Sequence, residues 1–243
     1  MTQDGRAVIG ITPAFDEGIK LAASKSTVYL RREYTKVLSQ LGAIPVVLTP
    51  DMPLGYIMEL CDGIVISGGE DIPPEVYDGD RLDTVQEPLE RVMWEQLIVD
   101  ACEAWRKPLL GVCYGMQLIA LHYGGKLCQN IATDDPLTLN HVCTFHDVAI
   151  QKDFLGLKRG STLSVASRHH QAVLELPDRF ELAASARDGV IEAISCDNMY
   201  GVQWHPESDD SGLVVYQAFI ERCGLGTNFT NRGGGDTILR YTK

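Results

Sequence analysis

The sequence predicts an α/β protein with a mostly parallel central sheet, helices on both faces, and antiparallel additions in its C-terminal half. Up to residue 123, short apolar runs alternate with stretches whose apolar residues keep helical spacing, which is typical of a parallel sheet. Beyond residue 140, β-like runs follow one another with little helix between them. No linker or internal repeat interrupts the pattern. We therefore expect one domain over 1–224 and a polar, glycine-rich tail over 225–243.

The first half of the chain supplies the alternating elements. Strands are expected at 7–12, 44–50, 63–69 and 108–113, and helices at 26–41, 56–61, 87–105 and 115–123. Gly42 ends the first helix, and Pro88 suits the first turn of the third one. Helices cover both faces of such a sheet, so ligands bind beyond the carboxyl ends of its strands. The glycine-rich segments "SGG" (67–69) and "GVCYG" (111–115) both fall at such ends.

The second half of the chain contains five β-like runs separated by turns. They cover 145–150, 161–167, 180–186, 190–195 and 200–205. Because little helix separates these runs, we expect antiparallel strands that continue the same domain. An amphipathic helix at 212–224 closes the domain.

Composition argues against several classes of function. The chain carries 33 acidic and 21 basic residues, a formal net charge of −12, and no cluster of Lys and Arg, so we expect no nucleic-acid partner. No apolar run reaches the roughly 20 residues that span a bilayer, and the first residues lack the features of a signal peptide. The seven cysteines contain no CxxC pair. We therefore expect no disulfide framework, no zinc site, and a cytoplasmic location.

The segment "GVCYG" places Cys113 between two glycines, where an apolar strand ends and a helix begins. This spacing matches a nucleophile elbow, in which glycines allow the close approach of strand and helix. The positive end of the following helix favours the thiolate of Cys113. The backbone N–H of Tyr114 is then available to an oxyanion. Short glycine patterns are common, so the spacing alone leaves open a buried cysteine in a tight turn.

A thiolate nucleophile needs a base, and "GVQWHPE" (201–207) offers His205 at the end of a β-like run. In an extended segment, residues two apart face the same way, so Glu207 can orient the ring of His205 and balance its charge. The competing interpretation, a surface histidine beside an acid, fits less well because the pair follows an apolar strand.

The remaining histidines have weaker signals. Adjacent residues of a strand point to opposite faces, so we expect at most one of His169 and His170 to face the site, in a structural or substrate-contacting role; His170 is the candidate. His141 and His146 show no third ligand at a suitable spacing, so we expect them to be structural rather than metal-binding. His122 lies in a helix and is expected to be a packing residue. No metal site and no cofactor are expected.

Together, "GVCYGMQ" and "GVQWHPE" resemble the class I glutamine amidotransferase family, whose fold is flavodoxin-like and whose triad is Cys, His and Glu. The resemblance implies Cys113 as the nucleophile, His205 as the base and Glu207 as its orienting partner. "SGGEDIPP" is similar to the family's oxyanion strand, which implies that the N–H of Gly69 joins that of Tyr114. The resemblance also implies that Gln117 contacts the bound glutamyl group.

Longer segments, among them "ASRHHQAV" and "DGVIEAI", resemble one branch, the γ-glutamyl-γ-aminobutyrate hydrolases of peptidase family C26, over about residues 7–222. This implies hydrolysis of a small γ-glutamyl amide without a cofactor. The branch usually has Arg after the nucleophile, whereas this chain has Tyr114, which is commoner in glutaminase domains that feed ammonia to a separate synthase. That alternative stays open, as does the choice between a monomer and a homodimer. A non-enzymatic binding module would require a broken triad.

Overall fold

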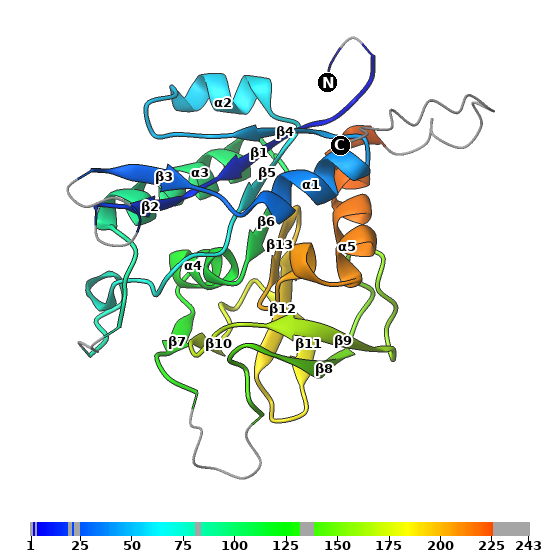
Figure 1. The fold of residues 1–243 in the computed structure, drawn as a ribbon. Helices are drawn as coiled ribbons and strands as arrows, with labels where there is room; N and C mark the ends of the chain where they lie inside the picture. The colour runs from blue at the N-terminus through cyan, green and yellow to red at the C-terminus, as the bar shows by residue number, and fades with distance from the viewer. Residues whose placement is uncertain are drawn as a thin grey trace, which may run out of the picture.

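A nine-stranded sheet forms the centre of the protein (Figure 1), in the order β4-β1-β5-β6-β13-β12-β11-β8-β9. The computed structural model describes residues 2, 4–18, 21, 25–80, 84–131 and 139–225. Five strands run parallel: β1 (Val8–Thr12), β4 (Ile44–Val47), β5 (Gly63–Ile66), β6 (Leu109–Val112) and β13 (Met199–Val202). Four antiparallel strands complete the sheet: β8 (Thr144–Ile150), β9 (Thr162–Ser167), β11 (Glu181–Ala186) and β12 (Ile191–Cys196). The predicted fold class is confirmed.

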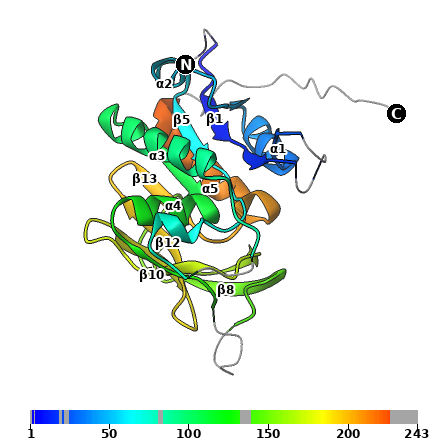
Figure 2. The ribbon, with the colours of Figure 1, turned by 90° about the vertical axis from the view of Figure 1, so that its left-hand side faces the viewer.

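Helices cover both faces of the parallel half (Figure 2). On one face lie α1 (Arg32–Gln40) and α5 (Ser211–Ile220), and on the other α2 (Leu54–Leu60), α3 (Leu89–Ala104) and α4 (Tyr114–His122). Two separate apolar cores result. Within β5, Val65 packs into the core under α1 and α5, while Ile64 and Ile66 pack into the core under the other three helices. A strand buried on both faces explains the continuous apolar run in the sequence.

Two small ribbons and three short helical turns lie outside these layers. The ribbons pair β2 (Ala14–Asp16) with β3 (Thr27–Tyr29), and β7 (Lys126–Cys128) with β10 (Ala172–Glu175). The turns cover Pro74–Val76, Pro206–Ser208 and Glu221–Leu225. The helix expected over 26–41 was placed too early, because 27–29 pair with β2 and the helix begins at Arg32. No described helix is both long and apolar enough to cross a bilayer. The expected tail lies outside the described residues from 226 onward.

The junction of the two halves of the sheet is β13. We expected the run 200–205 to be one more antiparallel addition, but β13 pairs in parallel with β6 and antiparallel with β12. In the parallel pair, Val202 stands opposite Val112. Because parallel strands end at the same edge of a sheet, the residues that follow β6 and β13 meet there.

Candidate active site

Cys113 occupies a strained turn between β6 and α4. Its backbone has φ 52° and ψ −107°, values that a non-glycine residue rarely adopts. The flanking glycines are required by space. A Cβ on Gly111 would lie 2.4 Å from the carbonyl oxygen of Gly115, and one on Gly115 would lie 2.4 Å from the carbonyl oxygen of Ile66. The segment therefore has the backbone geometry of a nucleophile elbow.

His205 reaches Cys113 through the pairing of β13 with β6. The N–H of Cys113 donates to the carbonyl of Val202 at 2.7 Å, which holds the two strand ends together. Nδ1 of the His205 ring lies 2.8 Å from Oε1 of Glu207, and the ring interacts electrostatically with Cys113. Glu207 Oε1 also accepts a hydrogen bond from Nη2 of Arg168 at 3.3 Å. His205 is thus joined to Glu207 by a hydrogen bond and to Cys113 by an electrostatic interaction.

The charge of His205 depends on these neighbours. Burial acts to lower the pKa of His205, but Cys113 and the carboxylate of Glu207 outweigh it and raise the pKa to about 9. A negative charge beside a buried imidazole favours the protonated form of the ring. The His205 ring therefore carries its proton at neutral pH.

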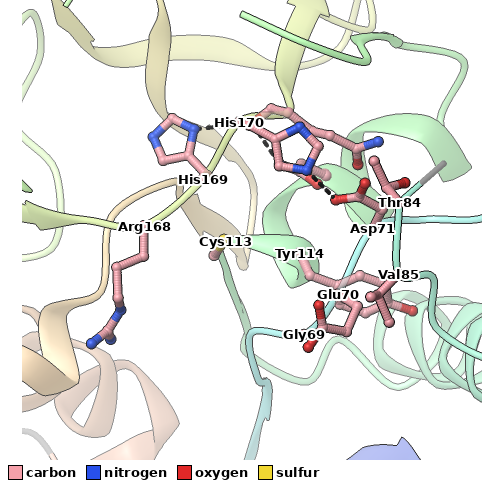
Figure 3. Close-up of a pocket in the computed structure, with 12 residues that line it drawn as sticks. Gly69, Glu70, Asp71, Thr84, Val85, Cys113, Tyr114, Arg168, His169 and His170 are labelled. Atoms are coloured by element: carbon pink, nitrogen blue, oxygen red, sulfur yellow. Dashed lines mark hydrogen bonds and ion pairs between the residues drawn. The ribbon is translucent and has the colours of Figure 1, made fainter. Parts of the chain in front are cut away.

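A pocket of about 390 Å³ opens beside Cys113 (Figure 3). Five of the residues predicted for the site line it: Gly69, Cys113, Tyr114, Gln117 and His170. The other described lining residues are Glu70, Asp71, Thr84, Val85, Arg168, His169 and Gln171. His205 and Glu207 are not among them; of the predicted triad, Cys113 alone lines the pocket.

Gly69 belongs to the loop after β5, which a buried ion cluster in and just before α3 holds in place. Arg91 Nη2 donates to the carbonyl of Ser67 at 3.0 Å, and the N–H of Glu70 donates to Glu87 Oε1 at 2.8 Å. Arg91 in turn lies 2.9 Å from Glu87. A Cβ on Gly69 would stand 2.3 Å from the Arg91 guanidinium, so this loop can approach the ion pair only with glycine there. We did not predict these residues; their four-residue spacing along one helix was the available signal.

The Tyr114 ring lies beneath the pocket and does not project into it. Its side chain is buried, and the guanidinium of Arg91 lies 4.2 Å from the centre of the ring. This is the geometry of a cation–π contact. Because the ring is directed into the core, the backbone of Tyr114 is the part that the pocket presents to a ligand.

Gln117 joins two walls of the pocket. Its Nε2 donates to the carbonyl of Gln171 at 3.0 Å and to Gln203 Oε1 at 3.2 Å. Gln203 Nε2 lies 3.5 Å from the sulfur of Cys113. A ligand that the side chain of Gln117 contacts would therefore sit between the elbow and the 168–171 loop.

His169 and His170 lie in a loop between β9 and β10, and our expectation that they belong to a strand was wrong. As a result, both residues contribute to the pocket wall, although their rings point in different directions (Figure 3). His170 Nε2 lies 2.9 Å from Asp71 Oδ1 across the pocket. Burial raises the pKa of the Asp71 carboxyl, which this histidine partly opposes.

Comparisons with known proteins identify the family of this chain. The peptidase C26 family model matches residues 7–207. Protein NtpR of Enterococcus hirae is 31% identical over 210 residues, covering 77% of this chain and 87% of that protein. One subunit of the glutamine-hydrolysing GMP synthase of Thermococcus kodakarensis is 34% identical over 131 residues (52% and 66%). The γ-glutamyl-γ-aminobutyrate hydrolase of Escherichia coli O157:H7 is 25% identical over 224 residues (82% and 87%).

A solved structure supports the fold. The crystal structure of a glutamine amidotransferase from Thermotoga maritima superposes with a TM-score of 0.57 at 14% identity, covering 90% of this chain and 94% of that one. At this level of identity the likeness concerns the arrangement of the sheet and its helices.

Proposed function

The chain belongs to the peptidase C26 family of class I glutamine amidotransferase-like C–N hydrolases, and from this premise we propose that it hydrolyses γ-glutamyl amides through a thioester on Cys113. The observation that carries the proposal is the elbow itself: Cys113 at φ 52°, which interacts electrostatically with a His205 ring that lies 2.8 Å from Glu207. This is the arrangement of nucleophile, base and orienting acid that covalent catalysis requires.

In the proposed mechanism, the thiolate of Cys113 attacks the γ-carbonyl carbon of the substrate. The N–H groups of Gly69 and Tyr114 donate to the oxyanion that forms. His205 gives its proton to the nitrogen of the leaving amine, and the C–N bond breaks to leave the γ-glutamyl thioester. The neutral ring then takes a proton from water, which attacks the thioester and releases glutamate. Glu207 keeps the ring of His205 oriented in both steps.

The lining of the pocket suits the glutamyl part of such a substrate. The carboxylates of Glu70 and Asp71 lie on the pocket wall and offer negative charge to an α-ammonium group, because a buried charge needs a partner. Gln117 and His170 also line the pocket, and under this proposal they contact the glutamyl part of the substrate. The proposal therefore covers γ-glutamyl amides as a class, of which γ-glutamyl-4-aminobutyrate is one member.

A second candidate is a glutaminase that passes ammonia to a separate synthase. The similarity to the GMP synthase polypeptide of Thermococcus kodakarensis favours it. The similarity to the γ-glutamyl-γ-aminobutyrate hydrolase favours the free hydrolase and spans more of the chain, 82% against 52%. Neither activity requires a cofactor, and a cytoplasmic location suits the seven cysteines, none of which is in a disulfide.

The test uses the purified full chain with γ-glutamyl-4-aminobutyrate, a neutral γ-glutamyl alkylamide and free glutamine, and measures glutamate release. We expect the two amides to have kcat/KM values at least about 10-fold above that of glutamine, a difference of about 1.4 kcal/mol in transition-state binding. The Cys113→Ala variant is the control for contaminating activity. Absence of turnover with both amides, or turnover of glutamine alone, would overturn the hydrolase proposal and favour the synthase-linked alternative.

A further inference from the structure

A second group of titratable side chains lies in the antiparallel half of the sheet, apart from the elbow. It consists of His141, His146, His169 and Glu192, called here the histidine cluster. All four are buried, and Glu192 is fully so. Residue 146 lies in β8 and residue 192 in β12, two strands separated by β11 (Figure 1), and the other two lie in loops beside them.

We expected His141 and His146 to be structural because no third ligand followed at a suitable spacing. The fold brings further ligands to these two histidines that are distant from them in the sequence. The loop after β9 brings His169, and β12 brings Glu192, from distant parts of the chain. One ligand atom from each of the four residues lies within 4.8 Å of all the others.

The facing atoms make no hydrogen bonds among the described residues. They are His141 Nδ1, His146 Nε2, His169 Nε2 and both carboxylate oxygens of Glu192. From Glu192 Oε1 to the three ring nitrogens the distances are 3.4, 3.3 and 3.7 Å. Four N and O ligands at the usual distance of about 2.0–2.1 Å from a tetrahedral Zn²⁺ ion stand about 3.4 Å from one another. The three distances from Glu192 Oε1 are therefore close to the edges of a zinc coordination shell, and all four ligand atoms lie within 4.8 Å of one another.

The outward-facing ring nitrogens have partners typical of metal-binding histidines. Nε2 of His141 lies 2.9 Å from Asp188 Oδ2, and Nδ1 of His169 lies 3.0 Å from the carbonyl oxygen of Gln171. Such acceptors hold a proton on the outer nitrogen and leave the lone pair of the inner nitrogen free for a metal ion. Asp188 is itself held by the N–H of Leu139 at 2.9 Å.

Hydrogen bonds among the described residues leave the facing polar atoms of this cluster unpaired. A buried carboxylate with neither oxygen hydrogen-bonded is costly, and buried polar groups in folded proteins nearly always have partners. One divalent cation would pair with Glu192 Oε1 and the three ring nitrogens at once. Imidazole and carboxylate ligands suit Zn²⁺.

We propose that the histidine cluster binds one Zn²⁺ ion in a closed, four-coordinate structural site. All four positions come from the protein, so the ion has no vacancy for substrate or water and takes no part in the chemistry at Cys113. Its role is to hold the loop 168–171. This loop lines the pocket, and its Gln171 carbonyl accepts hydrogen bonds from both Gln117 and His169.

The test measures zinc in the untagged full chain by elemental analysis, for the wild type and for His146→Ala. The control is His122→Ala, which removes a histidine on α4 that pairs with Asp100 instead of the cluster. We expect about one Zn²⁺ per chain in the wild type and the control, and less than about 0.2 in His146→Ala. Chelation should lower the Tm of the wild type by at least about 5 °C, and Zn²⁺ but not Mg²⁺ should restore it.

Two results would overturn the site. One is a chelated wild type that retains less than about 0.1 Zn²⁺ per chain after incubation with excess Zn²⁺ and gel filtration. The other is equal zinc content in His146→Ala and His122→Ala. If His146→Ala does not fold, Co²⁺-loaded wild type replaces it: the visible spectrum of four-coordinate Co²⁺ with N and O ligands supports the site, and a six-coordinate spectrum contradicts it.

Discussion

The parallel and antiparallel halves of the sheet each bury a charged cluster beside the pocket, and the two clusters balance their charges differently. On the parallel side, the Arg91 guanidinium lies between Glu87 at 2.9 Å and Glu95 at 3.1 Å. On the antiparallel side, the polar atoms of the histidine cluster face one another at 3.3 Å or more and make no hydrogen bonds among the described residues. The first cluster contains its own cation, whereas the second is the proposed binding site of a cation from solution.

The difference gives the two halves different tasks. The parallel half carries Cys113, Tyr114 and Gly69, whose positions depend on the elbow and on the Arg91 cluster. The antiparallel half carries the loop 168–171, which forms the opposite wall of the pocket. We infer that the parallel half performs the reaction and that the antiparallel half, with its ion, shapes the substrate site. The predictions below separate these tasks.

The largest effect is expected for Cys113→Ala, which removes the nucleophile from the parallel half. Its kcat/KM should fall by about 10⁴-fold or more, because groups that act as one catalytic unit fail together. Its zinc content should remain that of the wild type. Cys102→Ala, at a buried cysteine on α3, is the matched control and should retain activity. Loss of zinc in Cys113→Ala would show that the two halves are not independent.

Arg91→Met tests whether the parallel cluster depends on its own cation. The substitution leaves Glu87 and Glu95 buried without a positive partner, which should reduce the free energy of unfolding by about 3–5 kcal/mol. Arg179→Met, which removes a more exposed ion pair with Glu103, should cost only about 0–1 kcal/mol. Urea denaturation measures both. A cost for Arg91→Met as small as that of the control would mean that the cluster does not support the loop.

Glu207→Gln tests how the carboxylate beside His205, at the junction of the two halves of the sheet, affects the activity. The variant keeps the hydrogen-bonding shape of residue 207 but loses its charge, and we expect kcat/KM to fall by about 10²-fold. In the wild type, kcat/KM should fall above pH about 9, where His205 loses the proton that the leaving amine needs. Without the carboxylate, this alkaline limb should move to lower pH. An unchanged limb would show that another group controls it.

The same pKa has a consequence for stability. The pKa of His205 is raised in the folded protein from 6.5 to about 9, so the charged ring stabilises the fold fully below pH about 6.5. That contribution is lost as the pH rises through 9. Comparing urea midpoints of the wild type and His205→Ala across this range measures it, and the two should converge at the alkaline end.

The smallest effect is expected for Tyr114→Phe. The ring would still cover Arg91, and the backbone N–H would remain, so kcat/KM should stay within about 2-fold of the wild type. The ratio of its kcat/KM values for γ-glutamyl-4-aminobutyrate and for a neutral γ-glutamyl amide should also equal that of the wild type. A 10-fold change in that ratio would mean that the hydroxyl reaches the substrate, contrary to the buried position of the ring.

How far the sequence predicts the molecule also differs between the halves. In the parallel half, local signals located the strands and the Cys113 elbow, because glycines and apolar runs are properties of neighbouring residues. They placed the start of α1 too early and did not indicate the Arg91 cluster. In the antiparallel half, the strands were anticipated but their pairing was not, and β13 proved to be parallel to β6. The histidine cluster depends on long-range pairing that no local spacing reports. His169 and Glu192 meet only because β9 and β12 belong to the same sheet.

The most direct test of the proposed chemistry is to trap the acyl group on the elbow. The wild-type protein is mixed with a γ-glutamyl amide, quenched in acid within the first turnovers, and digested for mass spectrometry. We expect the peptide that contains Cys113 to carry one γ-glutamyl group and the peptides of the other six cysteines to carry none. Steady release of the amine with no acyl group on Cys113 would contradict the thioester mechanism.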